Sequence, residues 1–186
     1  MSKPIIGILS GSTRAASMNR KLVTAMAHVF ESAGAQAQII DLSDYDMPIY
    51  NGDDEEANGV PQATKRLIAD LSACDGVFIS TPEYNGCMPA LLKNAIDWTT
   101  RVELGQFTGP AYGIGSATPG ALSGIMALRQ LHFLLTRLGA LVVPTQLGVG
   151  HYGAAFNADG HLADAGTLSR AENLAGQMLS AIRNKK

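Results

Sequence analysis

Cysteine is scarce in this chain of 186 residues, and charge of either sign is modest. Only Cys74 and Cys87 are present, without a CxxC spacing, so the sequence predicts neither a disulfide framework nor a zinc site. The 14 basic and 16 acidic residues leave a net charge of −2, which argues against binding mainly to nucleic-acid phosphates or anionic lipid. No apolar run approaches the ~20 residues of a membrane span, and no signal-peptide layout precedes the first strand-like run. We therefore expect a cytoplasmic protein.

The sequence is rich in hydrophobic residues, and strand-like runs alternate with helical patterns along it. Hydrophobic residues make up 46% of the chain and charged residues 16%, which is ordinary for one globular domain, here residues 1–186. The predicted strands cover Pro4–Ser10, Ala37–Ser43, Gly76–Thr81, Ala111–Ala117 and Ala140–Val149, and the predicted helices cover Asn19–Gly34, Pro61–Ala73, Pro89–Arg101, Leu122–Leu138 and Leu168–Arg183. The polar segment Tyr45–Pro61 is predicted to be a surface loop.

This alternation predicts an α/β fold with a five-stranded parallel sheet, covered by helices on both faces, in the order 2-1-3-4-5. Ligands of such sheets bind outside the carboxyl ends of the strands, near the point where the strand order reverses. That rule selects the loops Ser10–Asn19, Thr81–Pro89 and Ser116–Gly124, which are rich in hydroxyl, amide or glycine residues. We expect the three loops to lie side by side.

The first loop, "SGSTRAASMNR", suits an anion. The helix that follows offers unpaired backbone N–H groups and the positive end of its dipole. The loop lacks the GxGxxG of dinucleotide binders and the GxxxxGK[ST] of nucleotide-triphosphate loops. Many hydroxyls and few cations favour a single terminal phosphate, such as that of flavin mononucleotide (FMN). The same residue types also cap helices and form turns where nothing binds, so this loop alone leaves both interpretations open.

The second loop, "TPEYNGCMPALLKNAIDW", carries a resemblance. Together with the first loop it resembles the NADPH-dependent FMN reductase family of flavodoxin-like proteins, which includes quinone, azo-dye and chromate reductases. The matching residues are Gly11, Ser12, Arg14, Ser17 and Asn19 of a GSxRxxSxN-like loop, Pro82, Glu83, Tyr84, Asn85 and Gly86 of a PEYN segment, and Leu92–Trp98 of an LKNAIDW-like helix. The resemblance implies a flavodoxin-like three-layer sandwich that binds FMN.

In that family the first loop holds the FMN phosphate and the PEYN loop holds the isoalloxazine ring. The predicted cofactor contacts are Ser10, Ser12, Arg14, Ser17, Met18, Asn19, Pro82, Glu83, Tyr84, Asn85, Gly86, Ser116, Thr118, Pro119 and Gly120. No catalytic side chain and no metal ligand is predicted, because the chemistry belongs to N5 of the flavin. The third loop departs from the family pattern, since Ser123 and Gly124 stand where two glycines are common.

Several residues have competing interpretations. Tyr84 offers an apolar plane to the flavin, or it is an exposed loop aromatic. For Glu83 a structural ion pair or an interface role is favoured over a general acid, and Cys87 is predicted to be a small buried residue rather than a redox thiol. Trp98 is expected to pack at the end of its helix. The four histidines are predicted to be structural: His28, His132, His151 and His161.

The leading functional hypothesis is an FMN-dependent NAD(P)H oxidoreductase that reduces quinones or similar small acceptors by ping-pong hydride transfer. The alternatives are a flavodoxin-type electron carrier and a cofactor-free regulatory module. The sequence does not distinguish NADPH from NADH. The resemblance implies a homodimer or a dimer of dimers whose subunits meet near the flavin. Apolar residues around the helices Pro89–Arg101 and Leu122–Leu138 exceed one core-facing stripe, which gives this some independent support. The alternative is that both helices are buried within one domain.

Overall fold

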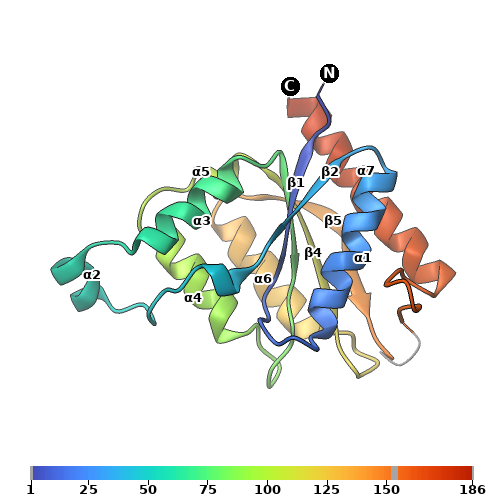
Figure 1. Cartoon of the computed structure of the whole chain (residues 1–186), viewed down its shortest axis with the longest axis horizontal. Coiled ribbons are helices and arrows are strands. Elements are labelled where there is room, and N and C mark those ends of the chain that lie inside the picture. Colours follow the sequence, from blue (N-terminus) through green and yellow to red (C-terminus); the bar gives the residue numbers. More distant parts are fainter. Residues whose placement is uncertain (1, 152–154, 186) are drawn as a thin grey trace.

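The computed structural model describes residues 2–151 and 155–185 and contains a five-stranded sheet with helices on both sides (Figure 1). In chain order the elements are β1 (Ile5–Ser10), α1 (Met18–Ser32), β2 (Gln36–Ile40), the 3-10 turn η1 (Leu42–Asp44), α2 (Gly52–Asn58), α3 (Gln62–Ser72), β3 (Gly76–Ser80), α4 (Ala90–Thr99), α5 (Gly105–Thr108), β4 (Ala111–Ala117), α6 (Ile125–Arg137), β5 (Leu141–Val149) and α7 (Ala165–Lys185).

The strand order is β2-β1-β3-β4-β5, and every neighbouring pair is parallel, as the alternation of strands and helices predicts. The five predicted strands and the five predicted helices are all present, with ends that differ by a few residues. The fold-class prediction, a flavodoxin-like α/β sandwich, is therefore confirmed.

Each face of the sheet has its own core. Ile6, Ile8 and Phe78 point to the face that α1 and α7 cover. Leu9 and Ile79, which alternate with them along β1 and β3, point to the face that α3, α4 and α6 cover. Central strands buried on both faces need apolar residues at consecutive positions, which explains the unbroken apolar runs of β1 and β3.

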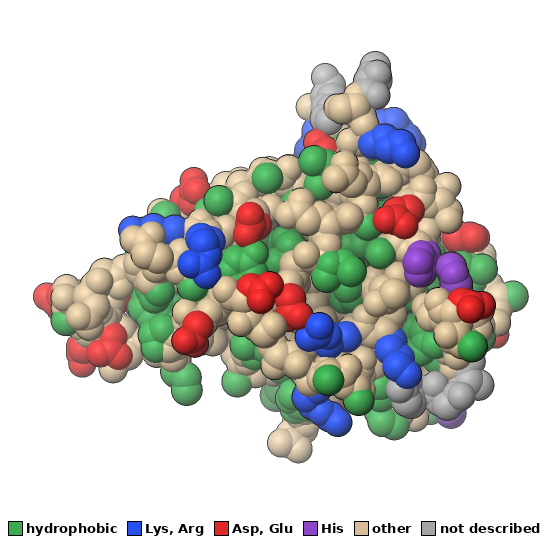
Figure 2. All heavy atoms as spheres, in the orientation of Figure 1, with side chains coloured by type: hydrophobic (Ala, Val, Ile, Leu, Met, Phe, Trp, Pro, Cys, Tyr) green, Lys and Arg blue, Asp and Glu red, His purple; other side chains and the backbone are tan. Residues whose placement is uncertain are grey.

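The arm, residues 45–61, corrects the prediction of a surface loop. It contains the helix α2, which extends away from the body of the molecule (Figure 1). The side chain of Asn51 caps α2 by accepting a hydrogen bond from Asp53 N at 3.0 Å, and acidic residues follow in its first turn. An Asn followed by acidic residues is a helix-start signal that the sequence analysis passed over. The acidic side chains of α2 lie at the far tip of the molecule (Figure 2).

The arm also corrects the expectation of a surplus apolar face on α4. Leu92, Ala95, Ile96 and Trp98 are all buried within this one chain. The indole N–H of Trp98 donates to the carbonyl oxygen of Pro48 in the arm at 2.7 Å. The arm covers α4, which therefore supplies no free apolar face of the kind expected. In the part of the chain that the structure describes, no helix is long and apolar enough to cross a membrane.

Candidate functional site

The loops after β1, β3 and β4 meet at one edge of the sheet, opposite the chain termini (Figure 1). Backbone hydrogen bonds link them at their bases, from Gly11 N to Ser80 O and from Thr81 N to Gly115 O, both 2.8 Å long. A Cβ added at Gly11 would lie 3.2 Å from side-chain carbon atoms of Pro82 and Pro89. The loops after β1 and β3 are therefore in close contact, at the edge where such sheets bind ligands.

The buried side chain of Asn19 connects the ends of β3 and β4, from which two of these loops start. Its Nδ2 donates to Ala117 O at 3.0 Å, and its Oδ1 accepts from Ala117 N at 2.9 Å and from the Ser80 hydroxyl at 2.8 Å. Only 3% of the residue is exposed. The side-chain amide of Asn19 therefore links β3 to β4. Because its hydrogen bonds are used there, the side chain does not face a ligand as the sequence analysis expected.

The serines of the first loop are also turned inward. The backbone N–H of Ser12 donates to the Ser10 hydroxyl at 3.1 Å, and the Ser17 hydroxyl caps α1 by accepting from Asn19 N at 3.2 Å. Ser10, Ser12 and Ser17 are all buried. Met18 packs its side chain against the core on the α1 side. The capping and turn-forming interpretation therefore applies to these hydroxyls, because they shape the turn that precedes α1. Phosphate binding by this loop stays a prediction.

The outer surface of the first loop remains suited to an anion. Arg14 is exposed, and Thr13 beside it is exposed as well. The loop leads into the N-terminus of α1, a 15-residue helix with no acidic residue in its first turn. Backbone N–H groups, the helix dipole and one guanidinium together can hold a single phosphate. Lys and Arg side chains gather on the lower part of the face in Figure 2, where this loop lies in Figure 1.

The second loop contains a tight two-residue turn. Tyr84 N donates to Cys87 O at 2.9 Å, and Cys87 N donates to Tyr84 O at 3.0 Å. The residues between them, Asn85 and Gly86, have φ of 54° and 75°. Positive φ at both central positions defines a type I′ turn, for which Asn-Gly is a preferred pair. The Asn-Gly dipeptide was therefore a turn signal that the sequence analysis did not use.

The turn leaves polar and aromatic groups accessible. Tyr84 is 45% exposed and Asn85 is exposed, whereas Pro82 is buried and helps form the base of the loop. Cys87 is exposed, so the prediction of a small buried residue is wrong at this position. The other cysteine, Cys74, is buried, and burial raises the pKa of its thiol. The exposed ring of Tyr84 can accept a planar ligand along this loop.

Glu83 caps a helix in this structure, where the sequence analysis favoured an ion pair or an interface role. Its Oε2 accepts hydrogen bonds from Met126 N at 2.9 Å and Ala127 N at 3.1 Å, so it caps the N-terminus of α6. The reason lies at Gly124, the N-cap residue of α6, which has no side chain to cap with. A Cβ at Gly124 would lie 2.0 Å from the Ser116 hydroxyl oxygen. Since α6 cannot cap itself there, the carboxylate comes from the neighbouring loop.

The third loop is only partly accessible. Ser116 is fully buried, and its hydroxyl has no partner among the described residues, so its side chain does not reach the surface where the sequence analysis expected a contact. Pro119 and Gly120 are exposed, and Thr118 is half-buried. Ser123 and Gly124 have φ of 54° and 74°. Both positions require the left-handed region, which explains why two glycines suit this place and why Ser123 is a departure.

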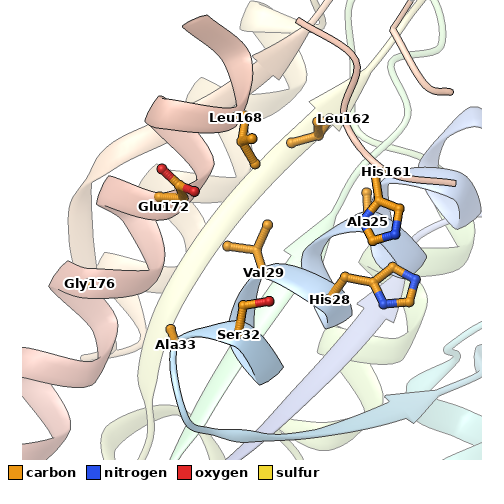
Figure 3. A pocket seen from close by; sticks show the side chains of 10 residues that line it. All are labelled: Ala25, His28, Val29, Ser32, Ala33, His161, Leu162, Leu168, Glu172 and Gly176. Carbon is orange, nitrogen blue, oxygen red and sulfur yellow. The ribbon is translucent and has the colours of Figure 1, made fainter. Parts of the chain in front are cut away.

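Two hollows of the described surface touch these loops: one of about 100 Å³ is lined by Ser10 and Ser12 of the first loop, and one of about 370 Å³ is lined by Ser123 of the third. Another lies away from them. A cavity of about 370 Å³ lies between α1 and α7, where His28 and His161 stack with their ring centroids 4.4 Å apart (Figure 3). Glu172 lies on the α7 side of this cavity. Among the described residues, no group of three or more His, Cys, Asp and Glu could hold a metal ion. The candidate site is therefore the open edge formed by the three loops.

Comparison with known proteins adds independent evidence. The family model described as NADPH-dependent FMN reductase matches residues 4–154. The chain is 33% identical over 135 residues to a quinone reductase of Escherichia coli (strain K12), covering 72% of this chain and 70% of that protein. It is 32% identical over 182 residues to a Pseudomonas aeruginosa protein named NAD(P)H-dependent FMN reductase, and the match covers 96% of this chain and 92% of that protein. Among solved structures, the flavoenzyme NAD(P)H:(acceptor) oxidoreductase FerB from Paracoccus denitrificans matches with a TM-score of 0.81 at 26% identity. The match covers 97% of this chain and 98% of that chain.

Proposed function

This chain belongs to the NADPH-dependent FMN reductase family, and on that premise we propose that it is an FMN-dependent NAD(P)H oxidoreductase that reduces quinones or similar small acceptors. The observation that carries the proposal is the first loop, which holds an exposed Arg14 before the N-terminus of α1 and whose base contacts the base of the second loop, with its exposed turn. An anion site next to a site for a planar ring is what FMN requires.

The residues present fit this cofactor. The backbone N–H groups before α1, with Thr13 and Arg14, would hold the phosphate. The loop Pro82–Gly86 and the exposed part of the third loop, Thr118–Gly120, would border the isoalloxazine ring. When bound, FMN supplies hydride acceptance from a nicotinamide and hydride donation to an acceptor, and the chain's own groups bind it and orient it.

The alternative, a flavodoxin-type carrier, would dock protein partners at the flavin through an acidic face. In this chain four consecutive acidic residues, 53–56, lie on the distant helix α2, and basic side chains lie near the loop edge (Figure 2). This distribution and the names of the relatives favour a reductase that uses small molecules. Because the sequence does not distinguish NADPH from NADH, the proposal names NAD(P)H.

Anaerobic titration of the FMN-loaded protein tests the proposal. We expect NADPH or NADH to bleach the bound flavin at one equivalent without a protein partner, and we expect a small quinone to restore the oxidised spectrum. If neither nicotinamide bleaches the flavin, the carrier hypothesis is favoured. If FMN does not bind at all, the cofactor-free module is favoured.

We also propose that two copies of this chain associate through α6. This helix leaves a row of apolar side chains exposed, while Leu128, Leu131 and Leu135 on its other side are buried in the core. The exposed residues of α6 are Ile125 at 39%, Met126 at 45% and Phe133 at 69%, and Leu122 in the loop before the helix is 74% exposed. Such a row favours an interface. Light scattering at micromolar concentration tests it: we expect the mass of a dimer or tetramer for the wild type, and a monomeric mass would contradict the association.

A further inference from the structure

The turn of the second loop needs support from elsewhere in the fold. Two hydrogen bonds between Tyr84 and Cys87 close it, and Tyr84, Asn85 and Cys87 are exposed. An isolated two-stranded turn is marginally stable in water. A loop that is to present fixed groups to a ligand must therefore be held by contacts outside the turn.

Gln130, in the second turn of α6, supplies such contacts. Its Oε1 accepts a hydrogen bond from Met88 N at 3.1 Å, and its Nε2 donates to Gly86 O at 3.3 Å. The same Nε2 lies 3.5 Å from the sulfur of Cys87. The amide thus pairs with a donor and an acceptor on the loop, which determines its orientation, because a flipped amide would place like groups together.

Glu83 attaches the start of the same loop to the same helix, through the two hydrogen bonds to Met126 N and Ala127 N. The loop is therefore held at both ends by α6, across more than 40 residues of sequence. The two attachments differ in direction: Glu83 extends from the loop to the helix terminus, and Gln130 extends from the helix to the turn.

We propose that Gln130 is a positioning residue that holds the turn Tyr84–Met88 in the conformation that receives the flavin ring. The identity of the ligand rests on the proposed function. The attachment of the turn by Gln130, called the lock below, is a property of the chain without ligand. Gln130 acts through the backbone of Gly86 and Met88, so its loss should weaken the binding of the ring and leave the binding of the phosphate intact.

Hydrogen exchange of the cofactor-free protein tests the lock. In Gln130→Ala we expect the amides of Tyr84 and Cys87, which bond within the turn, to exchange at least tenfold faster than in the wild type. Gln130→Glu keeps the size but replaces the donor to Gly86 O by an acceptor, so it should accelerate the same amides. The amide of Gly11, which bonds to Ser80 O in the neighbouring loop, is the internal reference. Thr136→Ala, on the exposed last turn of α6, is the matched control and should change none of them.

Binding of FMN and of riboflavin to the same variants tests the positioning. We expect Gln130→Ala to weaken both ligands by about the same factor, roughly tenfold, because both carry the ring. Wild-type exchange rates in both Gln130 variants would overturn the lock. Faster exchange with unchanged affinity for both flavins would overturn the positioning role. Faster exchange in a protein whose wild type binds no flavin would uphold the lock and refute the proposed function.

Discussion

The first and second loops of the candidate site lie side by side but are held by different kinds of contact. In the first loop, Ser10 bonds to Ser12 and Ser17 bonds to Asn19, each over two residues of sequence. The second loop is held by bonds from its own Glu83 to α6 and from Gln130 of α6 to the loop, and these bonds span 42 to 44 residues. The first loop is shaped mostly by its own sequence, and the second by the helix beside it.

This difference indicates which mutations should change the conformation of a loop and which should remove only a ligand contact. A loop shaped by its own residues can lose a ligand-binding side chain and keep its conformation. A loop held by a neighbouring helix changes its conformation when a distant residue is lost. Asn19 is the exception within the first loop, since its amide bonds to β3 and β4.

The largest effect on stability is expected at Asn19. Asn19→Ala leaves the Ser80 hydroxyl and the backbone groups of Ala117 buried without partners. An unsatisfied buried polar group costs about 1–3 kcal/mol, so the free energy of unfolding should fall by roughly 2–5 kcal/mol. Urea denaturation measures this.

Asn94→Ala is the matched control for Asn19→Ala. The Asn94 amide also makes two backbone bonds, to Tyr50 N and Pro48 O, but it holds the arm at a partly exposed position. We expect a loss of about 1 kcal/mol or less there, because water can replace the lost partners. Equal losses in the two variants would show that the link from Asn19 to β3 and β4 adds no more stability than a partly exposed amide.

The next effect concerns ligand binding by the first loop. Arg14 is exposed, and its loss should leave the loop conformation unchanged. A charge-assisted hydrogen bond contributes about 1.5–3 kcal/mol, so Arg14→Ala should weaken FMN roughly tenfold to a hundredfold. Fluorescence titration measures the affinity, with Arg183→Ala at the other end of the molecule as the control.

Riboflavin sharpens this comparison, because it lacks the phosphate. It should bind weakly to the wild type and equally weakly to Arg14→Ala. A wild type that binds riboflavin as tightly as FMN would refute the phosphate site.

The smallest effect is expected at the cap from the second loop. Glu83→Ala removes the acceptor for Met126 N and Ala127 N, and the loss of a helix cap costs about 0.5–2 kcal/mol. Glu83→Gln keeps an acceptor oxygen and should recover part of that loss, the remainder being the interaction of the charge with the helix dipole. Thermal unfolding of both variants measures the two contributions. A Glu83→Ala protein as stable as the wild type would show that α6 does not depend on this cap.

The sequence by itself determined the α/β alternation, the strand order and the three loops of the site, because these follow from hydrophobic periodicity and from rules of parallel sheets. It also placed Arg14 in a loop before a helix N-terminus, since both signals lie within a few residues. Local patterns of this kind can be recognised without knowing what packs against them.

Only the tertiary structure decided what the polar side chains contact. Asn19 bonds to Ala117, Glu83 caps α6, and Gln130 holds the second loop, each through a partner more than 40 residues away. The arm bonds to Trp98 of α4, and Gly124 lies close against the buried Ser116. A side chain's amide or carboxylate has no periodicity that reveals its partner, so these roles depend on how the folded chain brings distant segments together.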